Sequence, residues 1–286
     1  MSSTGTDSGA ALPATLQLGA VHLTIADLDR SVAFYEDALG LRVARREDPV
    51  AALGAGGEGL VVLHEEPNAR PAGRHAGLFH FALLYSTRTE LARAAQRLAV
   101  ARTPIDGASD HGVSEAIYLA DPDGNGIELY ADRPRAQWPA PSAGERVGMF
   151  TRALDVQELL ATVGGSEAAP QADPGLCMGH VHLHVGDLDA ARAFYVDVVG
   201  FEPMVTLPSA SFLAAGGYHH HLGANTWRGE GVGPAPAGTV GLREWTIVLD
   251  DDALAPLRAR LAAAGLGDGD VVADPWGIRL RFAPSS

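Results

Sequence analysis

Hydrophobic and polar residues alternate at the start of two similar stretches of the chain. The first stretch reads VHLTIADLDRSVAFYEDALGL from Val21, and the second reads VHLHVGDLDAARAFYVDVVGF from Val181. The alternation predicts a half-buried strand at the start of each stretch. An Asp-Leu-Asp start signal, an apolar face that ends in Phe-Tyr, and a glycine stop at Gly40 and Gly200 then predict a helix.

A fainter repeat follows in each half of the chain. It reads LFHFALLYSTRTELARAAQRL from Leu78 and LREWTIVLDDDALAPLRARL from Leu242, and further strands such as EAIYLAD and GIELYAD follow the helices. The unit is a strand, a helix and further strands, and it occurs four times. A unit that cannot bury its own sheet face must pair with a copy. We therefore predict an α+β fold with two tandem domains, each made of two paired βαβββ units that form a curved mixed sheet around a cavity.

The length of 286 residues is sufficient for two domains. We expect a disordered tail over residues 1–16 and a first, catalytic domain over residues 17–135. A linker rich in proline and small residues should cover residues 136–176, with a short helix at ALDVQELLATV. A second, structural domain should cover residues 177–284.

Composition narrows the classes of function. No apolar run is long enough to cross a membrane, and the N-terminal segment lacks the features of a secretory signal. Cys177 is the only cysteine, which excludes an intramolecular disulfide and favours a cytoplasmic location. The formal net charge of -14 would repel a phosphate backbone, so nucleic acid is not expected as a partner. Metal ions and small molecules remain, and homo-oligomerisation is left open.

Three polar side chains stand alone in apolar strands. His22 opens the first unit, His80 opens the second unit at the corresponding position, and Glu128 lies in GIELY on the last strand of the second unit. A buried carboxylate needs a partner, and one metal ion would satisfy all three residues. Two histidines and one carboxylate form the facial triad of non-haem Fe(II) sites. A single histidine in a strand is more often a core or surface residue, so the prediction depends on the joint placement.

The stretch DHGVSEAIYLADPDGNGIELYADRP, residues 110–134, resembles the signature of extradiol ring-cleaving dioxygenases. The matching residues are His111, the pair Ile117-Tyr118, the pair Asp121-Pro122, Gly124 and Glu128. Ser109 departs from the residue types usual two positions before the histidine. With its two similar halves and the run GGYHHHLGANTW, the chain resembles the vicinal oxygen chelate superfamily. That superfamily includes glyoxalase I, bleomycin-resistance proteins and extradiol dioxygenases, and the likeness is to two-domain bacterial catechol-2,3-dioxygenases.

The resemblance implies an extradiol dioxygenase that cleaves catechol or a substituted catechol with O2 at a mononuclear non-haem Fe(II), with Mn(II) as a substitute. His22, His80 and Glu128 would hold the metal, which leaves positions on an octahedral ion for both diol oxygens and dioxygen. His111 would act as the acid/base, and Tyr118 would hydrogen-bond the substrate. The alternative is that Tyr118 is a core aromatic residue and His111 a turn cap, because a catalytic role needs a geometry that sequence does not give.

The second half departs from this pattern. Glu244 takes the place of His80, and Arg279 takes the place of Glu128. A guanidinium stays protonated and cannot be an ordinary metal ligand. We therefore favour an ion pair between Glu244 and Arg279. The alternative is a rearranged metal site formed by His182, His221 and Glu244.

Two other classes of function remain open. A glyoxalase-type isomerase or lyase would require a fourth protein ligand to its metal ion. Residues 64–66 (His-Glu-Glu) lie near the position where such proteins place that ligand. A non-catalytic small-molecule-binding protein of the resistance type would need no metal. The expected buried triad argues against this second class.

Overall fold

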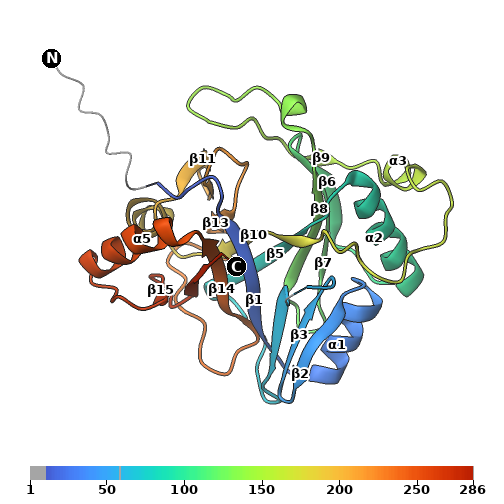
Figure 1. Ribbon diagram of the computed structural model, residues 1–286, viewed down its shortest axis with the longest axis horizontal. Coiled ribbons are helices and arrows are strands. Elements are labelled where there is room, and N and C mark those ends of the chain that lie inside the picture. The colour runs from blue at the N-terminus through green and yellow to red at the C-terminus, as the bar shows by residue number, and fades with distance from the viewer. Residues whose placement is uncertain (1–10, 58, 286) are drawn as a thin grey trace.

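The computed structural model describes residues 11–57 and 59–285, and Figure 1 shows their arrangement. Of the expected tail, residues 1–10 lie outside the described residues. Leu12 and Leu16 are buried, and the Leu12 N–H donates a hydrogen bond of 2.9 Å to the Gly200 carbonyl. This part of the expected tail is therefore packed against the second half of the chain.

The described strands form one continuous sheet with two curved parts, which we call sheet I and sheet II. Sheet I contains strands from both ends of the chain: β1 (Gln17–Ile25), β2 (Arg42–Glu47), β3 (Val50–Gly54), β4 (Val61–Glu65), β14 (Gly241–Leu249), β15 (Val271–Ala273) and β16 (Arg279–Pro284). Sheet II contains the strands between them: β5 (Gly77–Leu84), β6 (Gly107–Asp110), β7 (Ser114–Ala120), β8 (Gly126–Asp132), β9 (Arg152–Ala153), β10 (Cys177–His184), β11 (Glu202–Leu207), β12 (Ala210–Ala214) and β13 (Leu222–Asn225). The two sheets meet where β1 and β10 pair at Leu18 and Met178.

The paired units come from different halves of the chain. We predicted curved mixed sheets of paired units, which is confirmed, but we expected each pair to lie within one half. Instead β1 pairs with β14, and β10 pairs with β5, both antiparallel. Each opening strand also has a parallel neighbour from its own unit, β4 for β1 and β13 for β10. Each sheet therefore combines one unit from each half. The sequence did not predict this pairing, because the hydrophobic pattern specifies which face of a unit is buried but not which of the similar units covers that face.

Helices cover the outside of the sheet, as α1, α2 and α5 show in Figure 1. They are α1 (Leu28–Asp37), α2 (Arg88–Ala101), α3 (Val156–Ala161), α4 (Leu188–Arg192), the π-helix η2 (Ala193–Val199) and α5 (Asp251–Ala263), with a 3-10 turn η1 (Arg135–Gln137). The predicted start signals are confirmed, because the side chains of Asp27 and Asp187 cap α1 and α4. Gly40 and Gly200 have positive φ values of 70° and 102°, as the predicted stops require. No helix in the described part of the chain is long and apolar enough to cross a membrane.

A buried hydrogen bond ties the two units of each half together. In the first half, the Tyr35 hydroxyl donates to Asp121 over 3.1 Å, and in the second half the Tyr195 hydroxyl donates to Asp274 over 2.9 Å. Asp121 also accepts from the backbone N–H groups of Asp123 and Asn125. The Asp-Pro-Asp-Gly turn is thus fixed by its first aspartate, and this sets the register of β7 against β8.

Candidate functional site

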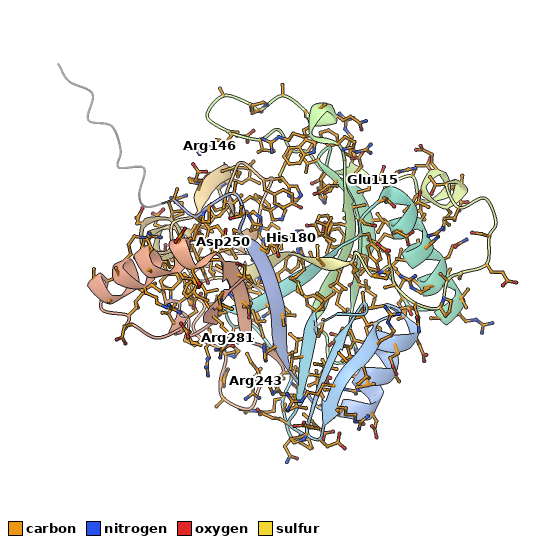
Figure 2. The ribbon with its side chains drawn as sticks, viewed as in Figure 1. Glu115, Arg146, His180, Arg243, Asp250 and Arg281 are labelled. Carbon is orange, nitrogen blue, oxygen red and sulfur yellow. The ribbon has the colours of Figure 1, made fainter. Side chains whose placement is uncertain are left out.

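Two histidines and one glutamate converge in the interior of sheet II. The Nε2 atoms of His80 and His180 both lie 3.0 Å from the same carboxylate oxygen, Oε2 of Glu128, and 3.3 Å from each other. All three residues are buried, and His180 is 1% exposed. Figure 2 shows His180 near the centre of the molecule.

These three donors fit a divalent transition metal ion. Metal–imidazole bonds are about 2.1 Å long, so neighbouring ligand atoms on one face of an octahedron lie about 3.0 Å apart. The three separations between the donor atoms are close to that value. Burial lowers the pKa of His180 to about 4, so its imidazole is neutral at neutral pH and can offer a lone pair. A carboxylate with two imidazoles is the donor set of the facial triad.

Strand register brings the three residues together. β5 lies between β10 and β8, antiparallel to the first and parallel to the second. His80 faces Gly126 on β8, two residues before Glu128. A Cβ atom at Gly126 would overlap the Phe79 carbonyl oxygen, so only glycine permits this close approach of β5 and β8.

His22 does not join this group, which was predicted to be His22, His80 and Glu128. The structure places His22 in sheet I, opposite Glu244 on β14, with its Nδ1 3.0 Å from His64 Nε2. The prediction assumed that β1 and β5 lie side by side, but β5 pairs with β10 instead. The residue that completes the group is therefore His180, from the half expected to be structural.

Strand register also identifies the corresponding positions in sheet I. On β8, Glu128 lies two residues beyond the partner of His80. On β16, Arg281 lies two residues beyond the partner of Glu244. Glu128 therefore corresponds to Arg281, and not to Arg279 as the sequence comparison suggested.

Two arginines form ion pairs with the Glu244 carboxylate in sheet I. The predicted ion pair is present, with Arg279 Nη2 3.2 Å from Glu244 Oε2, and Arg281 pairs with the same carboxylate. The repeat aligns His180 with Ala20, which offers no ligand atom. Figure 2 shows Arg281 and Arg243 well apart from His180 in the view. A carboxylate held by two guanidinium groups, beside an alanine, does not fit a metal ion.

The alternative site of His182, His221 and Glu244 is not formed. Glu244 lies in sheet I, whereas His182 lies in sheet II, opposite His80. The Nδ1 atom of His221 accepts a hydrogen bond of 3.2 Å from the Ala215 N–H.

We expect one equivalent of metal per chain, bound in sheet II. The Glu244→Gln variant should keep that stoichiometry, because its carboxylate already belongs to the arginines. Its free energy of unfolding should change by no more than about 1 kcal/mol, since Arg279 and Arg281 are 56% and 42% exposed. Elemental analysis after metal loading checks the first point, and urea denaturation checks the second. Two equivalents in the wild type, or loss of metal in this variant, would place a metal in sheet I.

His111 and Tyr118 lie together in a cavity beside the three converging residues. The cavity has a volume of about 510 Å³, and His80 and Glu128 also line it. The Phe150 carbonyl, 3.1 Å from His111 Nδ1, can only accept, so Nδ1 carries the proton. His111 Nε2 is then the acceptor for the Tyr118 hydroxyl at 2.8 Å. Burial, and then the Glu128 carboxylate, raise the pKa of Tyr118, so its hydroxyl stays protonated.

A chain of hydrogen bonds determines which ring nitrogen of His220, another histidine that lines the cavity, carries the proton. The Asp132 carboxylate lies 2.9 Å from His219 Nε2, and His219 Nδ1 lies 2.8 Å from His220 Nδ1. Since the carboxylate accepts, His219 Nε2 donates, and His220 Nδ1 must donate to the free nitrogen of His219. The Nε2 atom of His220 is then unprotonated. The ring centroid of His220 lies 4.1 Å from that of His180, so this base stands next to the group of three.

His182 also lines the cavity, on the same face of β10 as His180. Its buried Nε2 atom has no hydrogen-bond partner among the described residues. Gly223 on β13 makes room for its ring, because a Cβ atom there would lie 2.7 Å from the imidazole. An unsatisfied buried nitrogen beside a cavity is available to a ligand.

Alignment of the two repeats at a fixed offset did not identify His180 or His220 as residues of the site. The first repeat has Ala20 where the second has His180, so His180 had no counterpart there. The run HVHLH places three histidines, 180, 182 and 184, on one face of a strand, and this period of two was the available signal. His220 lies between two other histidines, and the sequence comparison placed only His219 and His221 on a common face.

Acid should destabilise the folded protein, because burial lowers the pKa of His180 to about 4 and that of His221 to about 3. Between pH 6.5 and those values the unfolded chain binds protons that the folded chain does not. The stabilisation is therefore complete above pH 6.5 and is lost as the pH falls, by up to about 1.4 kcal/mol per group for each pH unit. Urea denaturation of the metal-free protein at pH 7.5 and pH 5 checks this. The His221→Gln variant should show a shallower dependence, and a slope equal to that of the wild type would contradict the assignment.

Comparisons with known proteins show the family of the chain. The sequence model of the Glyoxalase/Bleomycin resistance protein/Dioxygenase superfamily matches residues 17–129 and 178–282. The chain is 45% identical over 237 residues to a protein of Bacillus subtilis (strain 168) named catechol-2,3-dioxygenase, with 81% of this chain and 82% of that protein covered.

Two solved structures share the fold. Glyoxalase I from Zea mays has a TM-score of 0.57 at 18% identity, over 94% of this chain and 92% of that one. A putative dioxygenase from Bacillus subtilis subsp. subtilis str. 168 has a TM-score of 0.60 at 15% identity, over 96% of this chain and 86% of that one. The family model covers both halves and the relative covers most of the chain, which confirms the predicted resemblance. The chain belongs to the Glyoxalase/Bleomycin resistance protein/Dioxygenase superfamily.

Proposed function

We propose that this protein is an extradiol dioxygenase that opens the ring of catechol or a substituted catechol with O2 at a mononuclear non-haem Fe(II), for which Mn(II) can substitute. The observation that carries the proposal is the convergence of His80, Glu128 and His180 beside a cavity that also contains His111 and Tyr118. The 45% identical relative named catechol-2,3-dioxygenase supports the choice of substrate.

His80, Glu128 and His180 would hold the ion on one face. When bound, the ion supplies binding positions for the two diol oxygens and for dioxygen, and it lowers the pKa of the bound phenol. The reaction needs no other reactant, because both oxygen atoms of O2 enter the ring-opened product as the carbon–carbon bond beside the diol breaks. The protein must therefore orient the diol, exclude water and move its two hydroxyl protons.

Two nitrogen atoms can accept those protons. The Nε2 atom of His220 is unprotonated, and the ring of His220 lines the cavity beside His180, so this histidine can accept a proton from a diol hydroxyl. The Nε2 atom of His111 accepts from the Tyr118 hydroxyl, so a proton given to the tyrosine oxygen can pass on to His111. Aromatic side chains form much of the remaining wall and exclude water around the diol.

The two alternative functions fit less well. A glyoxalase-type enzyme would want a fourth protein ligand, but His64 contacts His22, Glu65 accepts from the Leu28 N–H, and Glu66 pairs with Arg243. In sheet II, β13 occupies the place of β4 and reads Leu-Gly-Ala-Asn, without a carboxylate. A non-catalytic binding protein would have no use for a buried group of three converging ligand atoms.

Anaerobic loading with Fe(II), followed by oxygen uptake with catechol, tests the proposal. We expect one O2 consumed per catechol, with both atoms of ¹⁸O2 found in the ring-opened product by mass spectrometry. Apoprotein reloaded with Zn(II) is the control and should consume no oxygen. Absence of oxygen uptake by iron-loaded protein with every catechol tried would overturn the proposal.

A further inference from the structure

An apolar wall of the cavity begins beside His80, whose ring centroid lies 5.0 Å from that of His182, and extends to the surface. From His182 it continues through Phe79 and Phe212 to Trp227, with ring centroids of Phe79 and Trp227 5.2 Å apart. Trp227 and Leu207 are 51% and 43% exposed, and both line the cavity. Exposed large apolar side chains at the mouth of a cavity indicate contact with an apolar ligand group.

In the described part of the chain, the charged and titratable side chains that line the cavity are two glutamates, four histidines and one tyrosine. Among the described residues that line it there is no arginine, and the chain contains no lysine. Glu145 lies on the wall, whereas the Glu128 carboxylate at the buried end belongs to the group of converging ligands. The net charge of the chain, -14, adds a repulsive field for anions. A carboxylate substituent placed along this wall would lose water without gaining an arginine or lysine as a partner.

The size of the cavity permits more than a single ring. Its volume of about 510 Å³ falls within the range of roughly 300–1,000 Å³ that holds drug-sized ligands. A catechol bound through its two oxygens at the buried end would direct its ring substituent along the apolar wall.

From these observations we propose that the substrate is a catechol with an uncharged, apolar ring substituent, and that the cavity rejects catechols with a carboxylate substituent. This inference rests on the proposed function for the position of the diol. The choice of ring substituent follows from the residues of the cavity wall and not from the chemistry at the converging ligands. The residues that decide the selectivity are the apolar Leu207, Phe212 and Trp227 and the acidic Glu145, which all line the cavity.

Two catechols of similar size separate the two kinds of substituent: 4-propylcatechol and 3,4-dihydroxyphenylacetate. Their dissociation constants for the iron-loaded protein are measured without oxygen by equilibrium dialysis, and kcat/KM is then measured by oxygen uptake. We expect 4-propylcatechol to bind at least about tenfold more tightly, with a ratio of kcat/KM at least as large. Equal or tighter binding of 3,4-dihydroxyphenylacetate would overturn the inference.

The Leu207→Arg variant tests whether the wall causes the selectivity. It places a cation where the substituent should lie, so it should strengthen binding of 3,4-dihydroxyphenylacetate by roughly tenfold and weaken that of 4-propylcatechol. The matched control is Ile105→Arg, which makes the same change of charge at a residue that is 45% exposed and does not line the cavity. Equal effects of the two variants would show that net charge sets the selectivity, which also overturns the inference.

The outcomes distinguish this inference from the proposed function. If the expected difference in binding is present but no catechol is consumed with oxygen, the dioxygenase function is wrong and the assignment of the wall stands. If both catechols are cleaved with equal efficiency and bind equally, the dioxygenase function stands and the assignment of the wall is wrong.

Discussion

The His180→Ala variant should lose most of its bound iron and its ring-cleaving activity, whereas the His22→Ala variant should keep both. In sheet II, His180 Nε2 shares the Glu128 carboxylate oxygen with His80, so its removal leaves a histidine and a carboxylate. In sheet I, His22 contacts His64 and faces Glu244, and His22 is not part of the group of converging ligands. The two variants make the same substitution on the opening strands of equivalent sheets, one at a converging ligand and one outside that group.

Iron content by elemental analysis and oxygen uptake with catechol are measured on both variants. Because His180 is buried, the near-isosteric His180→Gln variant accompanies the alanine, and circular dichroism checks that each is folded. The Glu128→Gln variant, which keeps the shape of the side chain and removes its charge, should lose iron in the same way. Retention of iron by folded His180→Gln and Glu128→Gln, or its loss from His22→Ala, would show that the metal does not bind at the convergence in sheet II.

The sequence predicted the elements better than it predicted their partners. Strand alternation and the aspartate and glycine signals at Asp27 and Gly40 are local, so the strands and helices of the units were expected correctly. The pairing of β5 with β10 is a choice between similar copies, and nothing within either strand specifies it. His80 and Glu128 were found because they lie on neighbouring strands of one unit. His180 was missed because its strand arrives from the other half of the chain.

The same pairing locates the difference between the two sheets. Sheet I and sheet II have equivalent strand arrangements, but sheet I carries Ala20, Glu244 and Arg281 at the positions of His180, His80 and Glu128. The carboxylate in sheet I is satisfied by arginines, which stabilises it without a metal. Sheet II has the converging ligands together with the adjoining cavity. One half of the chain therefore does not act as scaffold for the other, because both halves contribute strands to both sheets.

The His111→Asn variant should lower kcat for catechol by about a hundred- to ten-thousandfold while the iron content stays unchanged, because acid/base assistance is typically worth that much. The Nδ1 atom of His111 is held by the Phe150 carbonyl, which leaves Nε2 to accept from the Tyr118 hydroxyl. His111 is not one of the converging ligands, so bound catechol should still perturb the iron spectrum under anaerobic conditions.

If His111 acts through the Tyr118 hydroxyl, the two side chains form one proton path. The Tyr118→Phe variant should then reduce kcat to a similar extent, and the double variant should be little slower than either single variant. Additive losses would show two independent contributions instead of one path. Wild-type turnover by His111→Asn would mean that the histidine only caps the turn at the start of β7, and His220 would remain as the base beside His180.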